Sequence, residues 1–474
     1  MSLTSTSFLV LALAAILLSR ALPAAARPWV LSAASVVFIG SYLDRPIEAL
    51  PLAGLLVGGY WVVEALRRTR SALLLTVALA TVVGSFLVLK RYGFVPAFAR
   101  VPLPYLVVGL SYVLFRLLHL MIDARQGELG RRIPVQQFFN YCAGFLTFTA
   151  GPIQLYPDFV EQQARGPSND PAEVADAMQR VVRGFVLVCV VSAVLNYVFA
   201  ALSVRLLQAT PQVAGPLVFA VCAALYTAYL YANFAGYMHI VIGVGALMGL
   251  RLPENFAQPF AARSFLEFWS RWHMTLSGWF KTYLFNPLLK RLTQRWPSAG
   301  SAPYLAVLAF FITFLVMGIW HGSTLVFVVY GLFLGAGASL NKLWQDAARA
   351  RWGKREYKRL SDQPLAIYAS RGLVFGYFAL ALTCLWVSLP QLLALAGSLG
   401  FVGVVGAFLA LSASAAVGFA VWDKARAVAG RWRLPHASTR SGWGAELAMA
   451  AQVLLVLGVG SFFHKAPEFV YRAF

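Results

Sequence analysis

Long apolar stretches separated by short polar connections run along the whole of this 474-residue chain. Several approach or exceed the roughly 18–20 residues that an α-helix needs to cross a bilayer. The alternating segments of about ten residues that a transmembrane β-barrel would show are absent. The pattern predicts an all-α, polytopic integral membrane protein with about 10–13 membrane helices, some of them re-entrant because several stretches are short or rich in glycine. The predicted spans are residues 8–26, 28–42, 50–66, 72–89, 104–122, 138–155, 181–206, 215–231, 239–250, 304–320, 324–340, 365–389, 392–421 and 447–463.

The sequence predicts a simple domain organisation. It has no internal repeat and no long linker, so we expect one membrane domain over residues 1–474. No basic segment precedes the apolar residues 8–18, so we expect a retained first helix rather than a cleaved signal peptide.

A polar connection contains the signals of a helix start at Asp170, Pro171 and Glu173. We expect the short amphipathic helix that follows to lie along the membrane surface.

Composition supports the membrane class and excludes others. Only 12% of the residues are charged, against about 25% in a soluble domain. The net charge of +21 comes from short basic patches between apolar stretches, which the positive-inside rule explains better than nucleic-acid binding does. Attraction to anionic lipid or to a polyanionic substrate is the other explanation. The four cysteines are far apart and have no metal-ligand spacing, so we predict no metal site.

His321 is the most informative single residue. Together with Trp320 and Gly322 it lies at the junction of two apolar stretches. A titratable group at membrane depth is costly, so it normally faces a cavity or carries chemistry, and imidazole exchanges protons near neutral pH. The alternative is a structural histidine that is hydrogen-bonded to a neighbouring carbonyl.

A second histidine lies in residues 265–285, which the periodicity predicts to be one helix with an aromatic face and a polar stripe nearly opposite. Such a helix suits the border of a wet cavity, whereas the alternative is an interfacial helix with tryptophan anchors at headgroup level. The aromatic face comprises Phe265, Phe268, Trp269, Trp272, Leu276, Trp279 and Tyr283, and the polar stripe comprises Ser270, His273, Ser277 and Lys281.

These segments resemble a known family. Residues Gly249–Phe256, Phe268–Phe280 and Met317–Gly322, with Tyr330 and Gly331 after them, resemble the membrane-bound O-acyltransferase (MBOAT) family. The most similar branch contains the alginate O-acetylation protein and the teichoic acid D-alanyl transfer protein. Weaker similarities, which extend the resemblance over nearly the whole chain, lie at Gly109–Tyr112, at Ala150–Ile153 and at the C-terminal Pro467–Phe474.

The chain also departs from the family pattern. Leu334 occupies the position at which many members have another histidine. The stretch after Pro287 lacks the Gly-Gly element common in alginate-type members. The second difference leaves the identity of the acceptor open.

The resemblance implies a fold in which a funnel meets a tunnel at the two histidines, with a catalytic core at about residues 104–342. His321 would be the general base, kept neutral by burial, and His273 would orient the acceptor, relay the proton or donate to the oxyanion. We expect Ser270, Ser277, Lys281 and Trp320 to line the site. Asn255 is a further candidate for the lining, although we favour the alternative that Pro253 and Asn255 shape a turn.

The resemblance further implies an acyltransferase of the bacterial cytoplasmic membrane. It would move an acyl group, which we expect to be acetyl, from a cytoplasmic thioester to hydroxyls of an exported polysaccharide or envelope glycan. The donor would be acetyl-CoA or an acyl-carrier protein, with no tightly bound cofactor, and a second protein outside the membrane could complete the transfer. D-alanyl transfer from a carrier protein toward a teichoic-acid-like polymer is the nearest alternative. A transporter or flippase with a histidine proton relay is another, although such proteins often show internal symmetry and this sequence shows none.

Overall fold

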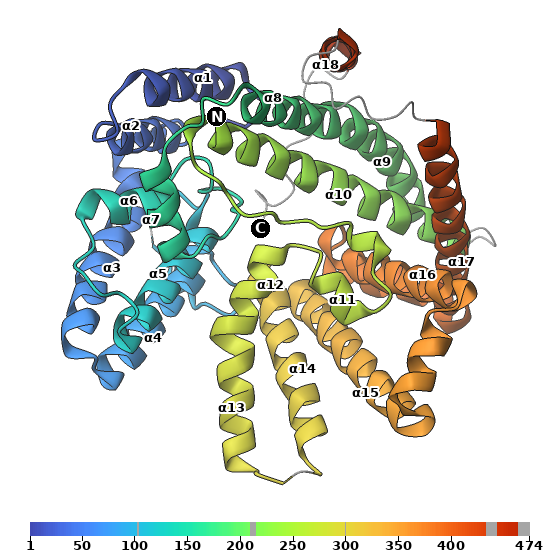
Figure 1. Cartoon of the computed structure of the whole chain (residues 1–474). Helices are drawn as coiled ribbons and strands as arrows, with labels where there is room; N and C mark the ends of the chain where they lie inside the picture. The colour runs from blue at the N-terminus through green and yellow to red at the C-terminus, as the bar shows by residue number, and fades with distance from the viewer. Residues whose placement is uncertain (102–103, 209–214, 299, 433–442, 463–474) are drawn as a thin grey trace. The chain divides into compact units, whose positions relative to one another are not determined.

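The computed structural model describes residues 1–101, 104–208, 215–298, 300–432 and 443–462. Within these ranges every regular element is helical except an isolated β-bridge between Phe256 and Trp272, which confirms the all-α prediction. The C-terminal segment Pro467–Phe474 lies outside the described residues. The α-helices, labelled in Figure 1, are α1 (Thr6–Ala21), α2 (Arg27–Gly40), α3 (Leu50–Thr69), α4 (Ala72–Leu89), α5 (Leu110–Gln126), α6 (Val135–Ala143), α7 (Tyr156–Arg165), α8 (Pro171–Phe185), α9 (Ala193–Gln208), α10 (Gly215–Met248), α11 (Phe265–Trp269), α12 (Met274–Phe280), α13 (Asn286–Arg295), α14 (Ala302–Trp320), α15 (Leu325–Ser361), α16 (Pro364–Ala381), α17 (Leu389–Trp432) and α18 (Trp443–Phe462).

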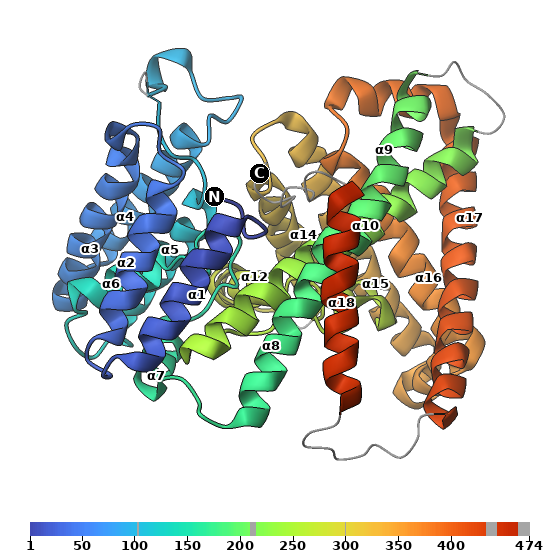
Figure 2. The ribbon, with the colours of Figure 1, turned by 90° about the horizontal axis from the view of Figure 1, so that it is seen from above.

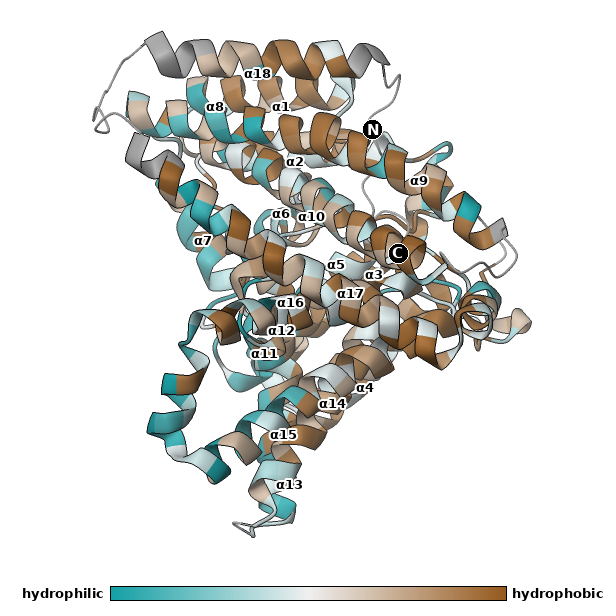
Figure 3. Cartoon of the chain, turned by 90° about the vertical axis from the view of Figure 1, so that its right-hand side faces the viewer, coloured by the Kyte–Doolittle hydropathy of each residue, from teal (hydrophilic) through white to brown (hydrophobic). Residues whose placement is uncertain are grey.

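Many of these helices are long and apolar enough to cross a membrane. In the described part of the chain eight helical stretches meet that description, and three shorter helices are apolar as well. Apolar residues predominate along α9, α14 and α17 (Figure 3). Large side chains such as Leu73 and Phe401 are 74% and 85% exposed, which suits contact with lipid rather than water. The chain is therefore a multi-pass membrane protein, as the sequence predicts.

The described helices fall into two compact units. The first comprises Met1–Val190, Asn233–Glu254 and the C-terminal segment from Ala448, and the second comprises Val191–Ala232 and Asn255–Leu447. In the first unit α3 and α4 both pack against α5. In the second, the most extensive helix pairs are α14 with α15, which run side by side in Figure 1, and α16 with α17, which do so in Figure 2.

Helix α8 starts where the sequence predicts but continues further. The Asp170 carboxylate accepts the Ala172 N–H at 3.0 Å, as expected of an N-cap. The helix then passes through a π-helical segment, Val186–Ser192, into α9, which gives one helical stretch from Pro171 to Leu207 with an apolar segment long enough to span a membrane. The expected amphipathic helix is therefore the first part of a longer helix, and its place along the membrane surface stays a prediction. Residues 186–207 contain neither glycine nor proline, so nothing ends the helix before it becomes a membrane span.

Two glycines allow α14 and α15 to touch. A Cβ atom on Gly318 would lie 2.1 Å from the Cα of Gly331, and one on Gly331 would lie 2.5 Å from the carbonyl oxygen of Leu315. Small residues permit this kind of backbone approach between membrane helices. Because Trp320 and His321 follow directly after α14 reaches this contact, the glycine pair fixes the position of His321 relative to α15.

We predict that Gly318→Ala destabilises the protein by about 1–3 kcal/mol, because the added methyl overlaps backbone that cannot move aside cheaply. Thermal unfolding in detergent, followed by the loss of the monodisperse peak on size exclusion, measures the effect. Gly84→Ala is the matched control, since a Cβ there meets nothing within 4 Å. Equal melting temperatures for the two variants would contradict the prediction.

Candidate active site

The segment around His273 is bent rather than helical throughout. Helix α11 ends at Trp269 and α12 begins at Met274, with His273 between them in the left-handed conformation (φ 46°, ψ 51°). A short antiparallel pairing takes the place of the helix: Met274 donates its N–H to the Asn255 carbonyl and Ala257 donates to the Arg271 carbonyl, both at 3.0 Å. The prediction of one helix over residues 265–285 is therefore wrong. A non-glycine residue in this conformation costs about 1–2 kcal/mol, so the surrounding contacts must hold it there.

The aromatic face is buried in protein. Trp272 is 1% exposed and lies between the rings of Phe256 and Phe378, with both centroids 5.0 Å away. Phe268 stacks on Trp272 at 5.5 Å and is fully buried. These rings anchor the bend inside the second unit. The alternative of an interfacial helix with headgroup-level tryptophans is therefore wrong.

The side chain of Asn255 holds the bend in place. Its Oδ1 accepts the N–H of Thr275 at 3.1 Å and the hydroxyl of Thr275 at 2.9 Å. The same oxygen lies 3.2 Å from Nδ1 of His273, and both Asn255 and His273 are almost fully buried. Asn255 therefore shapes the local backbone, as the favoured interpretation expects, and its side chain also contacts the histidine, while a role in lining the site stays a prediction.

This contact fixes the tautomer of His273. The backbone N–H of Thr275 can only donate, so it identifies the amide atom facing it as the oxygen. An amide oxygen can only accept, so Nδ1 of His273 carries the hydrogen and donates it. In the neutral ring Nε2 is then the acceptor atom.

His321 is also oriented by a hydrogen bond from its Nδ1, but here the acceptor is a backbone carbonyl. It caps the C-terminus of α14, and its Nδ1 lies 2.6 Å from the Met317 carbonyl oxygen. Since a carbonyl only accepts, Nδ1 of His321 also carries the hydrogen and Nε2 is the acceptor. The ring is 2% exposed and meets Tyr330 of α15 edge to face at a centroid distance of 5.5 Å.

The two imidazoles influence each other electrostatically. Burial, and secondarily the charge that His321 would carry, hold the pKa of His273 well below its ordinary value. Burial also lowers the pKa of His321, an effect that the hydrogen bond to Met317 partly offsets. Neither residue lies within a candidate membrane span. Burial therefore favours the neutral form of both rings, and a charge on His321 would further disfavour charging His273.

The remaining predicted lining residues differ in their surroundings. Ser270 is exposed, and its hydroxyl donates to the Glu267 carbonyl at 2.7 Å. Ser277 donates to the Trp272 carbonyl at 3.3 Å and Lys281 is exposed. Trp320 is 8% exposed and packs against the ring of His321. Asn255, His273, Trp320 and His321 are therefore all buried. Their roles in substrate binding stay predictions.

Sequence reasoning missed three contributors to this site. Thr275 fixes the amide of Asn255, the Met317 carbonyl orients His321, and the ring of Tyr330 packs against it. The family-like segments include all three residues without assigning a role to any of them, and Tyr330 stands out only as the aromatic residue that follows His321. The other two act through a short-range hydrogen bond or through backbone, which a residue pattern does not reveal.

The residues of the candidate active site lie within a region that matches a known protein family. The sequence profile of the membrane-bound O-acyltransferase family matches residues 123–360, which include Asn255, His273 and His321. The chain belongs to the membrane-bound O-acyltransferase family. The resemblance identified from the two histidine segments is thereby confirmed.

Individual relatives of this MBOAT chain fall into two groups. It is 30% identical over 229 residues to the teichoic acid D-alanyltransferase of Bacillus subtilis (strain 168), which covers 48% of this chain and 56% of that protein. It is 32% identical over 240 residues to the enzyme of the same name from Streptococcus thermophilus, covering 50% and 57%. It is 30% identical over 237 residues to the probable alginate O-acetylase AlgI of Pseudomonas aeruginosa, covering 50% and 43%. The matched region thus spans about half the length of each relative.

We predict that both rings are neutral Nδ1–H tautomers and stay neutral down to about pH 6, because a lowered pKa preserves the neutral form below the ordinary value of about 6.5. Nitrogen NMR of protein labelled with ¹⁵N-histidine measures tautomer and charge directly, and His273→Gln and His321→Gln assign two of the six histidines.

Two substitutions at Asn255 make this test specific. Asn255→Asp keeps an acceptor and adds a negative charge, so the signal of His273 should move toward imidazolium while that of His321 keeps its tautomer. Asn255→Leu should abolish the Nδ1–H preference of His273. A spectrum of His273 unchanged in both variants would show that Asn255 does not position the ring.

Proposed function

We propose that this protein is a membrane-embedded O-acyltransferase that acts on hydroxyl groups of an exported polysaccharide or cell-envelope glycan. The observation that carries the proposal is the pair of buried imidazoles whose Nδ1 atoms face the Asn255 amide oxygen and the Met317 carbonyl. Each ring keeps Nε2 as a proton acceptor. Acyl transfer to an alcohol needs such an acceptor, because the attacking hydroxyl must lose its proton.

In the proposed reaction His321 is the general base. Its Nε2 takes the proton of the acceptor hydroxyl as the hydroxyl oxygen bonds to the carbonyl carbon of a thioester. The carbon–sulfur bond then breaks, and the departing sulfur receives the proton from the imidazolium of His321. Ester and thiol are the products, and no proton is left on the enzyme.

Three roles were considered for His273 from the sequence: orienting the acceptor, relaying the proton and donating to the oxyanion. The tautomer of its ring excludes the third. With Nδ1–H committed to Asn255, the neutral ring has no hydrogen on Nε2 to donate to an oxyanion. It can accept a hydrogen bond from a neighbouring hydroxyl of the acceptor, or take up the proton in a relay. We therefore assign His273 to orienting the acceptor and, when His321 is charged, to sharing its proton.

The wider setting of the reaction follows from family membership and from the bacterial relatives. We propose a thioester donor on the cytoplasmic side, either acetyl-CoA or an acyl-carrier protein, and a location in the bacterial cytoplasmic membrane. A second protein outside the membrane would complete delivery to the glycan.

For the acyl group we propose acetyl. Two of the groups that contact the imidazoles, the Asn255 amide and the Met317 carbonyl, are uncharged. A D-alanyl group carries an ammonium, which is costly to bury beside neutral rings without an anionic partner. D-alanyl remains the second candidate because relatives named teichoic acid D-alanyltransferase match this chain over the larger share of their own length.

We predict that His321→Ala lowers the ester content of the surface glycan by about 10²–10⁴-fold, the usual contribution of a general base. His273→Ala should cause a smaller loss. Mass spectrometry of the glycan from a strain that carries only the variant gene measures both effects.

Membrane insertion and amount of each variant are checked by size exclusion of a fluorescent fusion. His239→Gln, a matched histidine substitution on α10 in the first unit, should leave esterification unchanged. Undiminished esterification in His321→Ala would rule out this residue as the base.

We predict that deletion of the gene removes acetyl esters, and that isotope from labelled acetate enters the glycan only when the gene is present. Mild alkaline hydrolysis followed by mass spectrometry distinguishes released acetate from released alanine. Loss of alanine with acetate unchanged would replace acetyl by D-alanyl and leave the role of His321 intact.

A further inference from the structure

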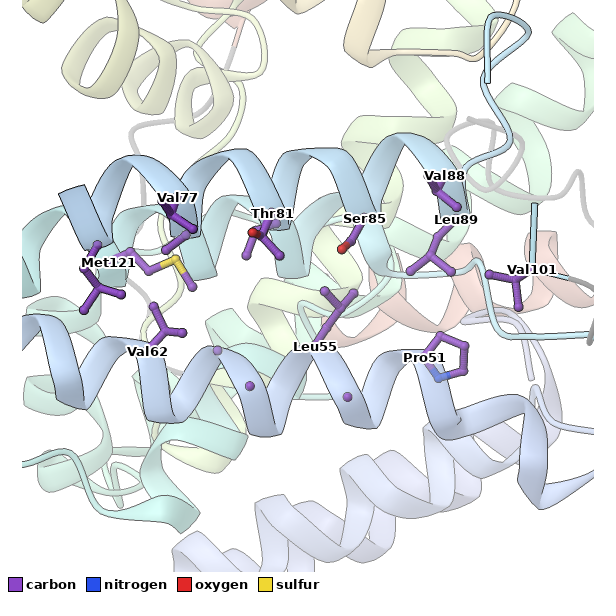
Figure 4. A pocket seen from close by; sticks show the side chains of 16 residues that line it. Pro51, Leu55, Val62, Val77, Thr81, Ser85, Val88, Leu89, Val101 and Met121 are labelled. Carbon is purple, nitrogen blue, oxygen red and sulfur yellow. The ribbon is translucent and has the colours of Figure 1, made fainter. Parts of the chain in front are cut away.

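An apolar groove lies between α3 and α4 in the first unit. These consecutive helices both pack against α5 but make little contact with each other, and they leave a cavity of about 580 Å³ between them. Figure 4 shows side chains from the two helices facing each other across this space, with Leu55 and Val62 on one side and Val77 and Thr81 on the other. A pocket of this volume falls in the range of small-molecule and lipid sites.

Two glycines of α3 keep the groove open. A Cβ atom on Gly54 or Gly58 would meet nothing within 4 Å, although both residues line the cavity. Glycine in a membrane helix normally lets a neighbouring helix approach, as Gly59 does for Leu117, whose side chain would lie 2.6 Å from an added Cβ. At Gly54 and Gly58 none of the residues that the structure describes takes up the space. Apolar walls without facing atoms lose dispersion contacts, so an apolar occupant would be stabilised there.

The dimensions fit one hydrocarbon chain. The lining of α3 runs from Pro51 to Val62, about 17 Å at the helical rise of 1.5 Å per residue. One leaflet contributes about 15 Å of the bilayer hydrocarbon core. Among the lining residues only Thr81 and Ser85 carry hydroxyl groups, and the rest are apolar. Both helices that form the groove are candidate membrane spans, so lipid chains surround them.

One end of the groove is basic. Val88, Leu89 and Val101 line this end, and Lys90 and Arg100 adjoin them directly in the chain. Residues 88–105 include Arg91 as a third cation and contain no acidic residue. Arg91 is engaged by Tyr105, to whose hydroxyl it donates at 3.2 Å.

The burial of Lys90 and the nearby carboxylate of Glu48 both affect the charge at this end of the groove. Burial lowers the pKa of Lys90, just beyond α4, to about 8, so a nearby anion would stabilise its charged form. Glu48 lies shortly before α3, and its carboxylate accepts the N–H of Asp44. Cations therefore outnumber this carboxylate where the groove meets the headgroup region.

We propose that the groove between α3 and α4 binds one hydrocarbon chain of an anionic membrane phospholipid, with the lipid phosphate beside Lys90 and Arg100. The occupant is a bilayer lipid because the walls are apolar over the length of one leaflet and the end is positively charged. This site is independent of the proposed acyl transfer, so either can fail without the other.

The test uses the full chain in nanodiscs of phosphatidylcholine that contain a trace of phosphatidylglycerol with a diazirine in one acyl chain. After irradiation, peptide mass spectrometry should find the probe on the segments that carry Leu55, Val62 and Val77. Filling the groove with Gly54→Leu and Gly58→Leu should reduce this labelling by about tenfold, equivalent to about 1.4 kcal/mol of binding.

Gly84→Leu is the matched control, because Gly84 also faces open space on α4 but does not line the groove. It should be labelled like the wild type. If the α3 variant does not fold, Thr81→Leu with Ser85→Leu fills the groove from α4. Equal labelling of filled and control proteins would overturn the site.

The charged end is tested separately. Lys90→Gln with Arg100→Gln should reduce labelling by the phosphatidylglycerol probe but not by a phosphatidylcholine probe with the same diazirine chain. Equal labelling by the two probes in the wild type would overturn the preference for an anionic lipid.

Discussion

The carboxamide oxygen of Asn255 is the point on which the candidate active site depends. It accepts two hydrogen bonds from Thr275 and faces Nδ1 of His273, so one buried atom orders both sides of the bend. Without these bonds, the left-handed backbone at His273 would be disfavoured by about 1–2 kcal/mol, and the segment would gain by continuing as a helix. The conformation of the buried His273 is thus maintained by a residue 18 positions upstream.

This dependence explains which parts of the structure the sequence predicts and which it does not. The apolar stretches that identify a multi-pass membrane protein and the cap at Asp170 are local properties, and both are confirmed. The bend at His273 is not local. The aromatic residues on either side keep helical spacing across the bend, so the periodicity predicts one continuous helix. Whether a single residue turns left-handed is decided by the pairing with Asn255–Ala257, which no window around His273 contains.

Family motifs and physical reasoning contribute different information about the same residues. The motif around His321 marks Gly318, Tyr330 and Gly331 together without saying why they occur. In the structure the two glycines bring α14 and α15 into backbone contact, and that contact places the ring of Tyr330 against His321. The motif is therefore a description of one packed junction, in which the glycines set the distance and the aromatic ring fixes the imidazole plane.

The two histidines also differ in how securely their tautomers are held. His321 donates to a backbone carbonyl, which a substitution at Met317 would leave in place. His273 donates to a side chain, so a single substitution at Asn255 can remove its acceptor or replace it by a charged one. A carboxylate at that position would favour imidazolium and so put a hydrogen on Nε2. The neutral amide instead keeps Nε2 as a proton acceptor, which is the property that makes a buried pair of imidazoles suited to removing the hydrogen of an alcohol.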